Sequence, residues 1–546
     1  MWWLILMQAA LALLMIFSAS VHYLHMLQLE SYQTDGYLRH LKRQSSEWKG
    51  WTLICGIVCA VAPWVLLVAS SMFTGNRSDA YLASQLLNTG IFVIWSFVNI
   101  YRDHRAPKKK PIVFTKRMKR LCAVHAGVLA ALLFLFILIF GYYPSDSTTK
   151  WRLTLLSPYA LMALCPWLII LSARAAKPIE DRINRGFFES AAAKLSANKK
   201  LIKIGITGSY GKTGTKFALA TILSVKYKVL TSESSVNTPM GLSKLINTKL
   251  EDSHEVFIAE MGARHTGDIK ELTQLVRPSV GLITSIGPQH LETFGNVETV
   301  AKTKFELIEA LPKNGTGIFA SDGAWTDKLY ERAGCEKLKS GVGAGDYDMR
   351  AENIEVGAFG SRFTLVNRAG ESVNCETTLL GRHNISNVVL CCLAAEKLGL
   401  TMSEIARGVK LIRPVEHRLQ LLPGELNVID DAFNSNPAGA KEALNVLHSF
   451  PGRHLIITPG FVEMGADENK FNYEFGRQIA KSADAVILVG PKHTRPILQG
   501  LLKEGFDKDS VLTVNTLDEA SKNIRRFVSG GDAVLFENDL PDNYAE

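Results

Sequence analysis

The stretch 204–216, IGITGSYGKTGTK, carries a glycine-rich turn, a lysine and a hydroxyl residue in an order that can hold the phosphates of a nucleotide. Backbone N–H groups in such a turn can point at phosphate oxygens at the start of a helix. Lys212 can reach the β- and γ-phosphates, and the hydroxyl of Thr213 can hold Mg²⁺. The turn is shorter than the common phosphate loop, because Ile206 stands where that loop has its first glycine. We predict a nucleotide site made by seven consecutive residues: Gly208, Ser209, Tyr210, Gly211, Lys212, Thr213 and Gly214.

Three further residues with chemical potential lie at the borders of predicted elements. Glu260 ends the apolar run 255–261, His290 follows another apolar run, and Lys304 lies at the start of a helical pattern. An acid at the carboxyl edge of the sheet that carries the phosphate loop can be a Mg²⁺ ligand. We therefore interpret Glu260 as a metal ligand, with a helix cap or a salt bridge as the alternative.

The elements that must position these residues are predicted from the alternation of patterns after residue 200. Apolar β-like runs alternate with helical patterns, which predicts βαβ units and a mostly parallel sheet. Residues 345–380 instead alternate with period two around turn glycines, and we predict antiparallel hairpins there, inserted in the first α/β unit. We place a domain boundary between 200–412, an α/β nucleotide-binding domain, and 413–546, a Rossmann-like α/β domain. The predicted strands are 201–207, 255–261, 280–286, 426–431, 454–460 and 484–490.

The first 176 residues have the composition of a membrane domain. Five apolar stretches are long enough to cross a bilayer, which predicts an all-α domain of five transmembrane helices over 1–176. Basic residues concentrate in three flanking segments, above all in 102–120, which holds nine Lys or Arg. The positive-inside rule then predicts a multi-pass protein of the cell membrane with its N-terminus outside and its later domains in the cytoplasm. The pattern of 177–199 predicts an amphipathic linker helix. The predicted spans are 2–19, 51–73, 82–101, 121–142 and 153–173.

Composition excludes several classes of protein. A net charge of +9 would suit nucleic acid, an anionic membrane surface or a membrane topology. The main basic run lies between two apolar stretches, which favours topology, and no nucleic-acid partner is predicted. The eight cysteines are scattered without a CxxC pair, so buried hydrophobic side chains are favoured over a zinc site or a disulfide framework.

Seven ordered motifs, spread over about 200–490, resemble the Mur ligase family, and within it the MurF branch, which adds D-Ala-D-Ala to a muramoyl-tripeptide precursor. The resemblance implies an ADP-forming acid–amino-acid ligase. Such a ligase uses ATP and two Mg²⁺ to activate a carboxylate as an acyl phosphate, which an amine then attacks. The motifs are the loop at 204–216, NTPMG at 237–241, AEMGARHTGDI at 259–269, GPQHLETFG at 287–295, AKTKFEL at 301–307, LLGRHNISN at 379–387 and DDAFNSNP at 430–437.

The same resemblance implies roles around the phosphates. Lys212 would hold the β- and γ-phosphates, and Thr213 with Glu260 would hold one Mg²⁺. His290 matches a ligand of a second Mg²⁺. Lys304 matches a lysine that family members carbamylate, which turns a cation into a carboxylate. Lys302 is a close rival for that role, and an ordinary surface lysine is the alternative for either.

Further roles follow on the nucleoside side of the implied site. Asn384 and Asn387 match the adenine and ribose contacts. A second interpretation is that Asn384 or His383 caps the helix that follows. Arg418 and Asp431 match residues that the C-terminal domain brings onto the nucleotide and the incoming amine. Asn434 and Asn436 continue that motif.

The chain departs from the MurF pattern in three places. The N-terminal domain that grips a UDP-sugar is replaced by the predicted spans. The loop TPGFVEMG has Gly460 where an acid is common, although Glu463 is retained. The C-terminal end carries acidic residues instead of a basic motif, namely Glu537, Asp539 and Asp542.

These departures do not change the prediction of a ligase, but they leave more than one substrate open. The leading hypothesis is a membrane-anchored ligase that joins a carboxylate-bearing envelope precursor, lipid-linked in one version, to an amino acid or dipeptide. A poly-amino-acid or capsule ligase of the poly-γ-glutamate type is the alternative. A transporter or sensor with a phosphate-loop motor is disfavoured because the spans lack polar pathway residues. A catalytically dead scaffold is disfavoured because the predicted catalytic set is retained: Lys212, Thr213, Glu260, His290 and Lys304.

Overall fold

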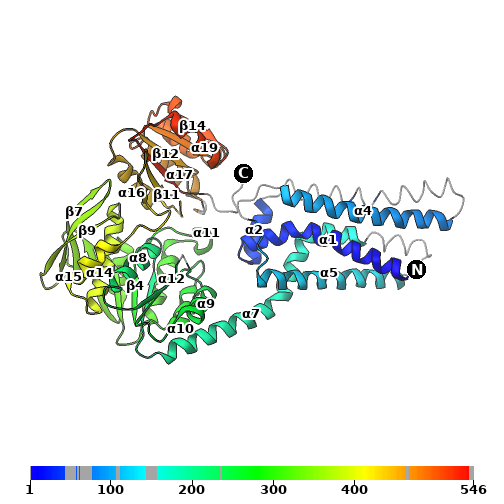
Figure 1. The fold of residues 1–546 in the computed structure, drawn as a ribbon, viewed down its shortest axis with the longest axis horizontal. Helices are drawn as coiled ribbons and strands as arrows, with labels where there is room; N and C mark the ends of the chain where they lie inside the picture. The colour runs from blue at the N-terminus through cyan, green and yellow to red at the C-terminus, as the bar shows by residue number, and fades with distance from the viewer. Residues whose placement is uncertain are drawn as a thin grey trace. The chain divides into compact units, whose positions relative to one another are not determined.

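The chain forms two compact units in the computed structural model, and the division falls between Ile183 and Asn184. Figure 1 shows the helical first unit and the α/β second unit as separate bodies. The residues that the structure describes are 2–43, 57, 61, 77–105, 111–142, 157–233, 236–433, 435–462, 464 and 467–539.

The described part of the first unit is helical, as its composition predicts. Helix α1 packs against α4 and α5, and apolar side chains such as Met15, Ile16 and Leu129 are fully buried between them. Buried histidine and serine side chains also lie in this helical unit, and His125 shares a 2.8 Å hydrogen bond with Ser172. The helices are α1 (Trp2–Leu29), α2 (Thr34–Arg43), α4 (Arg77–Arg105), α5 (Lys116–Tyr142) and the first part of α7 (Cys165–Ala197).

Two helices in the described residues are long and apolar enough to cross a membrane, α1 over Met7–Leu29 and α5 over Lys116–Ile139. A third candidate is the pair Ser157–Ala163 and Cys165–Ala197, if these helices, bent by 79° at their junction, form one span. Helix α4 covers the predicted span 82–101 but does not pass this test among the described helices. The predicted span 51–73 lies outside the described residues apart from 57 and 61. Five spans therefore stay a prediction.

The predicted linker helix over 177–199 is not a separate element. Helix α7 runs without a break from Cys165 to Ala197 and contains Pro178. A proline inside a helix removes one hydrogen bond to the preceding turn, but Pro178 is exposed, so water can satisfy the carbonyl left without a donor. The last turns of α7 belong to the second unit, where Ala191 and Leu195 are buried.

The first sheet of the second unit has nine strands in the order β2-β3-β1-β4-β5-β6-β7-β8-β9. Strands β1 to β7 pair in parallel, and β7, β8 and β9 pair antiparallel. The predicted hairpins over 345–380 therefore form, but they extend the parallel sheet rather than standing apart from it. The strands are β1 (Ile202–Thr207), β2 (Val229–Thr231), β3 (Val256–Glu260), β4 (Val280–Ile283), β5 (Thr316–Ala320), β6 (Glu336–Val342), β7 (Met349–Gly357), β8 (Gly360–Asn367) and β9 (Ser372–Thr377).

Helices cover this sheet and bury its apolar side chains. Helix α14 is the most buried of them, with Val388, Leu390 and Cys391 fully enclosed against α8 and the sheet. The described cysteines are free, and Cys375, Cys391 and Cys392 behave as buried hydrophobic side chains. The helices are α8 (Lys212–Leu223), α9 (Pro239–Lys249), α10 (Asp268–Val276), α11 (Leu291–Phe294), α12 (Val297–Glu309), α13 (Ala324–Arg332), α14 (Arg382–Lys397) and α15 (Met402–Leu411).

A second sheet of six strands follows in the order β10-β11-β15-β12-β13-β14, parallel except for β10. All six strands predicted from the sequence are confirmed to within three residues at either end. The elements are β10 (Gln420–Leu422), β11 (Asn427–Asp431), α16 (Pro437–His448), β12 (His454–Thr458), α17 (Glu468–Ile479), β13 (Ala485–Val489), α18 (Arg495–Lys503), η2 (Lys508–Ser510), β14 (Val511–Val514), α19 (Leu517–Asn523), η3 (Ile524–Arg526) and β15 (Ala533–Glu537).

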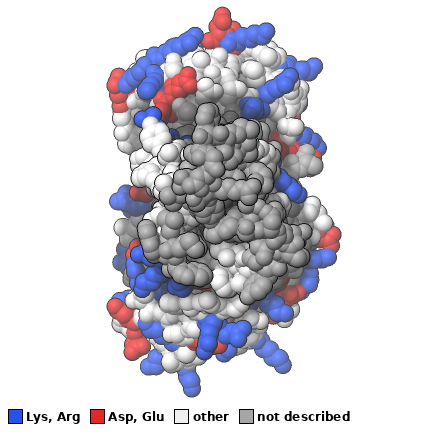
Figure 2. All heavy atoms as spheres, turned by 90° about the vertical axis from the view of Figure 1, so that its right-hand side faces the viewer, with Lys and Arg blue, Asp and Glu red and all other residues white. Residues whose placement is uncertain are grey.

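Charged side chains are interspersed on the face of the described residues drawn in Figure 2, where Lys and Arg alternate with Asp and Glu. Mixed signs of this kind are typical of an ordinary solvated surface.

Candidate functional site

The predicted phosphate turn has the strand–turn–helix geometry that its sequence indicates. Strand β1 ends at Thr207, helix α8 begins at Lys212, and the turn lies between them. Gly208 and Gly211 have φ values of 152° and 78°, a region where side chains with a Cβ are strained. A Cβ on Gly208 would also lie 2.0 Å from the hydroxyl of Thr284, so glycine is required there for space as well as for conformation.

The lysine of the turn is folded back onto the turn itself. The ammonium of Lys212 donates to the carbonyls of Gly208 and Ser209 at 2.6 and 2.9 Å. Burial lowers the pKa of Lys212 to about 8, although the carboxylate of Glu260 acts in the opposite direction. A partly desolvated ammonium held by carbonyls can exchange these partners for the oxygens of a phosphate, which carry full negative charge.

Glu260 lies where its sequence position predicts, at the end of β3 and against the phosphate turn. Its carboxylate accepts from the hydroxyl of Thr213 at 3.1 Å and from the amide of Asn237 at 3.2 Å. The ammonium of Lys216 is 3.4 Å away, and both charged side chains are essentially inaccessible to solvent. The salt bridge, which is the alternative interpretation of Glu260, is therefore present. Metal binding by Glu260 stays a prediction. Lys216, one turn beyond Thr213 on α8, was not predicted, although its spacing of four residues from Lys212 was a usable signal.

Lys304 is a buried side chain of α12, exposed by 1%. Burial lowers its pKa well below the ordinary lysine value, and the neighbouring charge of Lys212 lowers it further. The rival Lys302 has 64% of its side chain exposed and pairs with Glu298 at 2.9 Å. A surface lysine is therefore the correct description of Lys302 and the wrong one for Lys304.

His290 follows β4 and caps the short helix α11 with a left-handed backbone, φ 51°. Its backbone carbonyl accepts from the amides of Thr293 and Phe294. Its predicted role as a ligand stays a prediction.

Two asparagines on the first turns of α14 approach the phosphate turn from the other side. A Cβ added to Gly211 would lie 2.7 Å from the side-chain amide of Asn387, so these positions are in direct contact. The amide of Asn384 donates to the carbonyl of Leu380 at 2.8 Å. Helix α14 begins at Arg382 after Gly381 and has no side-chain cap, so the expectation that Asn384 or His383 caps it is wrong. Gly381 occupies the N-cap position of this helix with φ 81°.

The connection into the C-terminal domain is conformationally strained. His417 and Leu419 both have positive φ, at 60° and 45°, which is costly for residues with large side chains. Hydrogen bonds hold this segment against β11: the imidazole of His417 lies 2.7 Å from a carboxylate oxygen of Asp430, and the amide of Leu419 donates to Asp431 at 2.9 Å. Arg418, between them, stacks on the ring of Phe433 at 4.7 Å.

Asp431 and Glu537 form a pair of carboxyl groups. They lie opposite each other in the register of the parallel strands β11 and β15, and Glu537 is fully buried. The hydroxyl of Ser435 donates to Glu537, and Asp431 also receives the amide of Leu419. Burial raises the pKa of Asp431 to about 6, the charge of Asp430 raises it further, and the contact with Glu537 acts in the opposite direction. Burial raises the pKa of Glu537 well above its usual range, and the charge of Asp431 raises it further.

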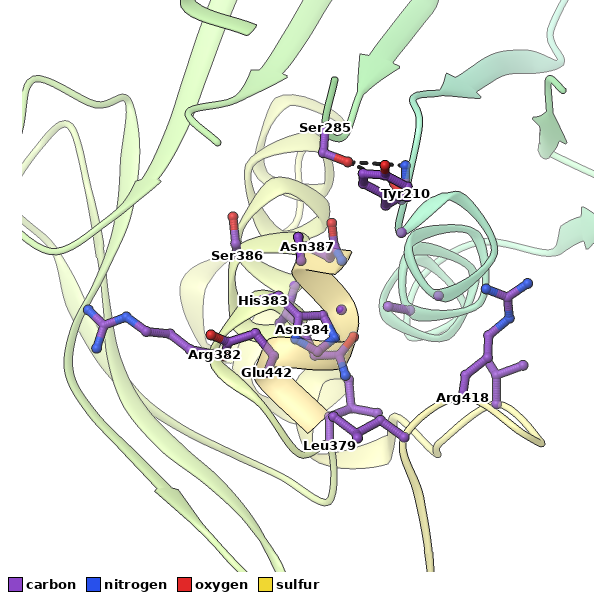
Figure 3. Close-up of a pocket in the computed structure, with 18 of the residues that line it drawn as sticks. Tyr210, Ser285, Leu379, Arg382, His383, Asn384, Ser386, Asn387, Arg418 and Glu442 are labelled. Carbon is purple, nitrogen blue, oxygen red and sulfur yellow. Dashed lines mark hydrogen bonds between the residues drawn. The ribbon is translucent and has the colours of Figure 1, made fainter. Parts of the chain in front are cut away.

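These elements enclose a cavity of about 460 Å³ between the two α/β domains of the second unit. Figure 3 shows Asn384 and Asn387 on α14, with Tyr210 and Arg418 reaching the same pocket from other elements. Of the predicted residues, the lining includes Tyr210, Gly211, Gly214, Asn384, Asn387, Arg418, Asp431 and Asn436.

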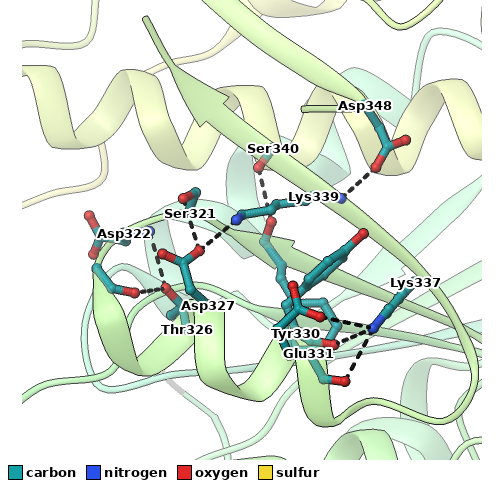
Figure 4. Close-up of polar contacts among 12 residues, drawn as sticks. Ser321, Asp322, Thr326, Asp327, Tyr330, Glu331, Lys337, Lys339, Ser340 and Asp348 are labelled. Atoms are coloured by element: carbon teal, nitrogen blue, oxygen red, sulfur yellow. Dashed lines mark hydrogen bonds and ion pairs between the residues drawn. The ribbon is translucent and has the colours of Figure 1, made fainter. Parts of the chain in front are cut away.

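Ser321 and Asp322, which follow β5, also line this cavity and were not predicted. A network drawn in Figure 4 holds them: the hydroxyl of Ser321 donates to Asp327, whose carboxylate pairs with Lys339 at 2.8 Å, and the amide of Asp322 donates to Thr326. Burial raises the pKa of Asp322 to about 6. The available signal was the position of the pair directly after a buried parallel strand, where ligands of such sheets bind.

Some of the remaining predicted residues lie in the described part of the chain, and others do not. Asn436 caps helix α16 by accepting from the amide of Gly439 at 3.0 Å. Gly460 has φ 83°, and its carbonyl accepts from Asn538. Three residues lie outside the described part of the chain: Asn434, Glu463 and Asp542.

Comparisons with known proteins agree with this geometry. The profile of the Mur ligase middle domain matches residues 206–395, and that of the Mur ligase glutamate ligase domain matches residues 417–537. The UDP-N-acetylmuramoyl-tripeptide–D-alanyl-D-alanine ligase of Escherichia coli is 31% identical over 317 residues, which are 57% of this chain and 69% of the relative. The enzyme of the same name from Bacillus subtilis is 28% identical over 61% of this chain and 72% of its own length.

Solved structures show the same fold. The crystal structure of MurF from Acinetobacter baumannii has a TM-score of 0.60 at 24% identity, over 65% of this chain and 77% of that one. MurF from Thermotoga maritima in complex with ADP has a TM-score of 0.59 at 22% identity, over 65% and 80% of the two chains.

The fold and the relatives define an ATP-dependent, ADP-forming ligase of an acid and an amino acid. The chain belongs to the Mur ligase family, whose members use ATP and Mg²⁺ and include ligases of peptidoglycan synthesis.

The residues beside the phosphate turn fit a Mg²⁺ ion. Thr213 and Glu260 put a hydroxyl and a carboxylate together, and oxygen ligands of this kind are what Mg²⁺ prefers. No cluster of three or more His, Cys, Asp or Glu side chains with metal-binding geometry occurs in the described residues. The second Mg²⁺ stays a prediction.

Proposed function

We propose that this chain is a membrane-anchored Mur ligase that joins the carboxylate of an envelope precursor to an amine of an amino acid or dipeptide. The observation that carries the proposal is the cleft itself. Its middle-domain wall presents the phosphate turn and Asn387, and its C-terminal wall presents Arg418 and Asp431. An ATP-dependent ligase needs phosphate-binding groups and amine-binding groups on opposite sides of one reacting carbonyl.

The residues of the middle domain would handle the nucleotide. Lys212 and the amides of the turn hold the β- and γ-phosphates, while Asn384 and Asn387 face the nucleoside. Mg²⁺, when bound by Thr213 and Glu260, neutralises charge on the phosphates. Lys216 balances Glu260 when the metal is absent, because the two side chains already form a buried ion pair.

Lys304 and the C-terminal wall would handle the acyl group and the amine. The low pKa of Lys304 leaves a fraction of its amine neutral, and only a neutral amine reacts with CO₂ to give a carbamate. Arg418 faces the transferred phosphoryl group. Asp431 receives the ammonium of the second substrate and takes its proton, so that the free amine can attack the acyl phosphate. His290 is proposed beside the second metal.

The substrate of this chain is proposed to be lipid-linked. The E. coli and B. subtilis relatives are named for a UDP-linked precursor, and the matched region covers the two α/β domains of this chain. The residues before Ile183 form a separate helical unit with two or three candidate spans. A membrane unit in this place would keep the cleft near a carboxylate carried by a lipid, at high effective concentration.

The proposal is tested with the full-length protein in detergent, by ADP release against a panel of acyl and amine substrates. The panel contains a lipid-linked and a UDP-linked muramoyl peptide, each with D-Ala-D-Ala, and glutamate oligomers for the poly-γ-glutamate alternative. A fragment that starts at Asn184, the boundary of the compact unit, is assayed in parallel. Equal activity of fragment and full chain on the UDP-linked precursor would refute a lipid-linked substrate, and activity on glutamate oligomers alone would favour the alternative.

The proposed topology has its own test. A reporter fused after Gly75 is expected outside the cytoplasm, and one fused within 105–115 is expected inside it. The opposite pattern would overturn the orientation without touching the assignment of the ligase.

A further inference from the structure

The first unit contains a cavity of about 490 Å³ that the ligase reaction does not use. Its apolar part consists of Leu27, Leu121, Ala173 and Ala176, which come from α1, α5 and α7. Its polar part consists of Tyr32, Gln33, Thr34, Asp35, Arg117, Arg174, Lys177, Glu180 and Asp181. One cavity thus joins an apolar wall to a wall that carries three cationic side chains.

The cavity lies at the end of the candidate spans. The candidate span of α1 finishes at Leu29, just before the polar lining begins at Tyr32, and that of α5 starts at Lys116, just before Arg117. Helices α1 and α5 pack together, so the two ends are at the same level. The charge rule assigns this end to the cytoplasmic side, where lipid headgroups meet the interior of the cell.

Polar contacts tie the walls of the cavity to one another and leave its interior open. The amide of Gln28 donates to the carbonyl of Val113 at 2.7 Å and receives the amide of Val113 at 3.0 Å. Glu180 on α7 receives two hydrogen bonds from the guanidinium of Arg120 on α5, at 2.6 and 2.7 Å. These contacts connect α1, the start of α5 and α7 around one space.

The turn between α1 and α2 forms part of the polar rim of the cavity and has an unusual backbone conformation. Ser31 and Tyr32 are consecutive non-glycine residues with left-handed backbones, at φ 54° and 65°. Such conformations persist only where the surrounding structure holds them, and they concentrate at binding sites. Here they bring the ring of Tyr32 under the guanidinium of Arg117, 4.1 Å from its centroid.

The rim carries three acids, Asp35, Glu180 and Asp181, and other cations engage two of them. Glu180 is already engaged by Arg120, which lies outside the lining, and Lys177 pairs with Asp181 at 3.0 Å on an exposed face. Arg117 is 3.9 Å from Glu180, too far for a hydrogen bond. Arg174 makes no ion pair or side-chain hydrogen bond that the structure shows within its described residues. Arg117 and Arg174 therefore have donors to spare, and Asp35 is the acid of the lining that remains beside them. Guanidinium binds phosphate in a bidentate manner.

We infer that this cavity binds the phosphate headgroup of an anionic single-chain lipid, with Arg117 and Arg174 on the phosphate and the apolar wall on the first carbons of the chain. The inference rests on the proposed membrane placement of the first unit and extends it from an anchor to a lipid-binding site. It does not depend on the chemistry in the cleft of the second unit.

The test is a direct binding measurement on the full-length protein in a neutral, zwitterionic detergent, with dodecyl phosphate as the probe. Dodecyl phosphate is expected to bind the unaltered protein. Substituting both Arg117→Gln and Arg174→Gln is expected to weaken binding at least about tenfold, since each charge-assisted contact is worth a factor of that order. Arg182→Gln is the matched control, because Arg182 lies on the same helix, is exposed and is absent from the lining.

Two further probes separate the sources of the effect. Inorganic phosphate that binds as tightly as dodecyl phosphate would overturn the lipid assignment in favour of a free anion. Dodecyl maltoside that competes equally well would overturn the role of the phosphate. Equal binding of dodecyl phosphate by the double variant and the control would overturn the site.

Folding and ligase function are read separately in the same samples. The double variant should keep its thermal unfolding profile, and a variant that fails to fold is replaced by the single change Arg174→Gln, since Arg174 holds no described partner. Loss of ligation in Lys212→Ala with dodecyl phosphate binding intact would separate a failure of the proposed lipid site from a failure of the proposed ligase function.

Discussion

The two walls of the ligase cleft handle negative charge in opposite ways. On the middle-domain side, next to the phosphate turn, the carboxylate of Glu260 has an ammonium, a hydroxyl and an amide as partners, from Lys216, Thr213 and Asn237. On the C-terminal wall, the carboxyl groups of Asp431 and Glu537 face each other. The first side is electrically balanced, because a buried ammonium lies 3.4 Å from the buried carboxylate. On the C-terminal wall both pKa values are raised, so its protonation depends on pH, as the proposed role of Asp431 as a proton acceptor requires.

The largest effect is expected on the balanced wall. Lys212→Ala removes the one ammonium of the phosphate turn, and ADP release should fall by at least about 10³-fold, the scale of losing a phosphate-stabilising cation. Lys226→Ala is the control, because Lys226 is exposed, and its partners are the carbonyl of Gly399 and the ring of Tyr227. Unchanged turnover in Lys212→Ala would remove the turn from the active site.

Lys304→Ala should cost about 10²-fold in turnover, the scale of a misplaced reacting group. If a carbamate is the active form, acetate or formate should restore part of the activity by occupying the emptied space. Lys302→Ala on the same helix should behave like the unaltered enzyme, because Lys302 is exposed. High activity of Lys304→Ala without added carboxylate would contradict the role.

Glu537→Gln tests the proton-holding wall, with an expected loss of about tenfold in turnover and a changed pH profile. The pKa of Asp431 is raised to about 6 from 3.8. The protonated group therefore stabilises the fold below about pH 4, and this contribution is lost as pH rises through about 6. The pKa of Glu537 is raised well above its usual range, so its protonated form also stabilises the fold and this contribution is lost as pH rises. Gln cannot ionise, so the variant should lose less thermal stability with rising pH than the unaltered protein.

Thermal unfolding and kcat against pH measure both effects. Glu425→Gln serves as the control, since Glu425 is an exposed acid of the same domain paired with Arg525. A pH profile identical to that of the unaltered enzyme would show that the pair carries no catalytic proton.

The smallest effect is expected at Asp322. Asp322→Asn keeps the shape of the side chain and removes its charge, so the KM for ATP should change by only about fivefold, the worth of a single hydrogen bond. The pKa of about 6 implies that the KM of the unaltered enzyme changes between pH 5 and 7, and that this change disappears in the variant. Asp346→Asn, at an almost fully exposed side chain, is the control. A KM that keeps its pH dependence would place Asp322 away from the nucleotide.

Local patterns were sufficient for the parts of the site that are local in the chain. The turn at 208–211 needs only its flanking strand and helix, and its glycines indicate a backbone with positive φ. The position of Glu260 at the end of a buried strand predicted its place beside Thr213, because parallel strands end at one edge.

Features set by packing over long distances were not accessible. The pairing of Asp431 with Glu537 depends on β15 inserting between β11 and β12, and no pattern in 533–537 states that order. The burial of Lys304 and the exposure of Lys302 follow from which face of α12 meets the sheet, and the sequence left both candidates open. Likewise, α7 continues through Pro178 because solvent on that side makes the break unnecessary.

The contact between Gly211 and Asn387 limits which substitutions this part of the cleft can tolerate. Position 211 needs glycine for its backbone, and it needs glycine again because a Cβ would lie 2.7 Å from the amide of Asn387. A compensating truncation at 387 would relieve the crowding and leave the backbone strain, so no second change rescues a first one. We therefore expect a substitution at either position to impair the site, and we expect no single further substitution to restore it.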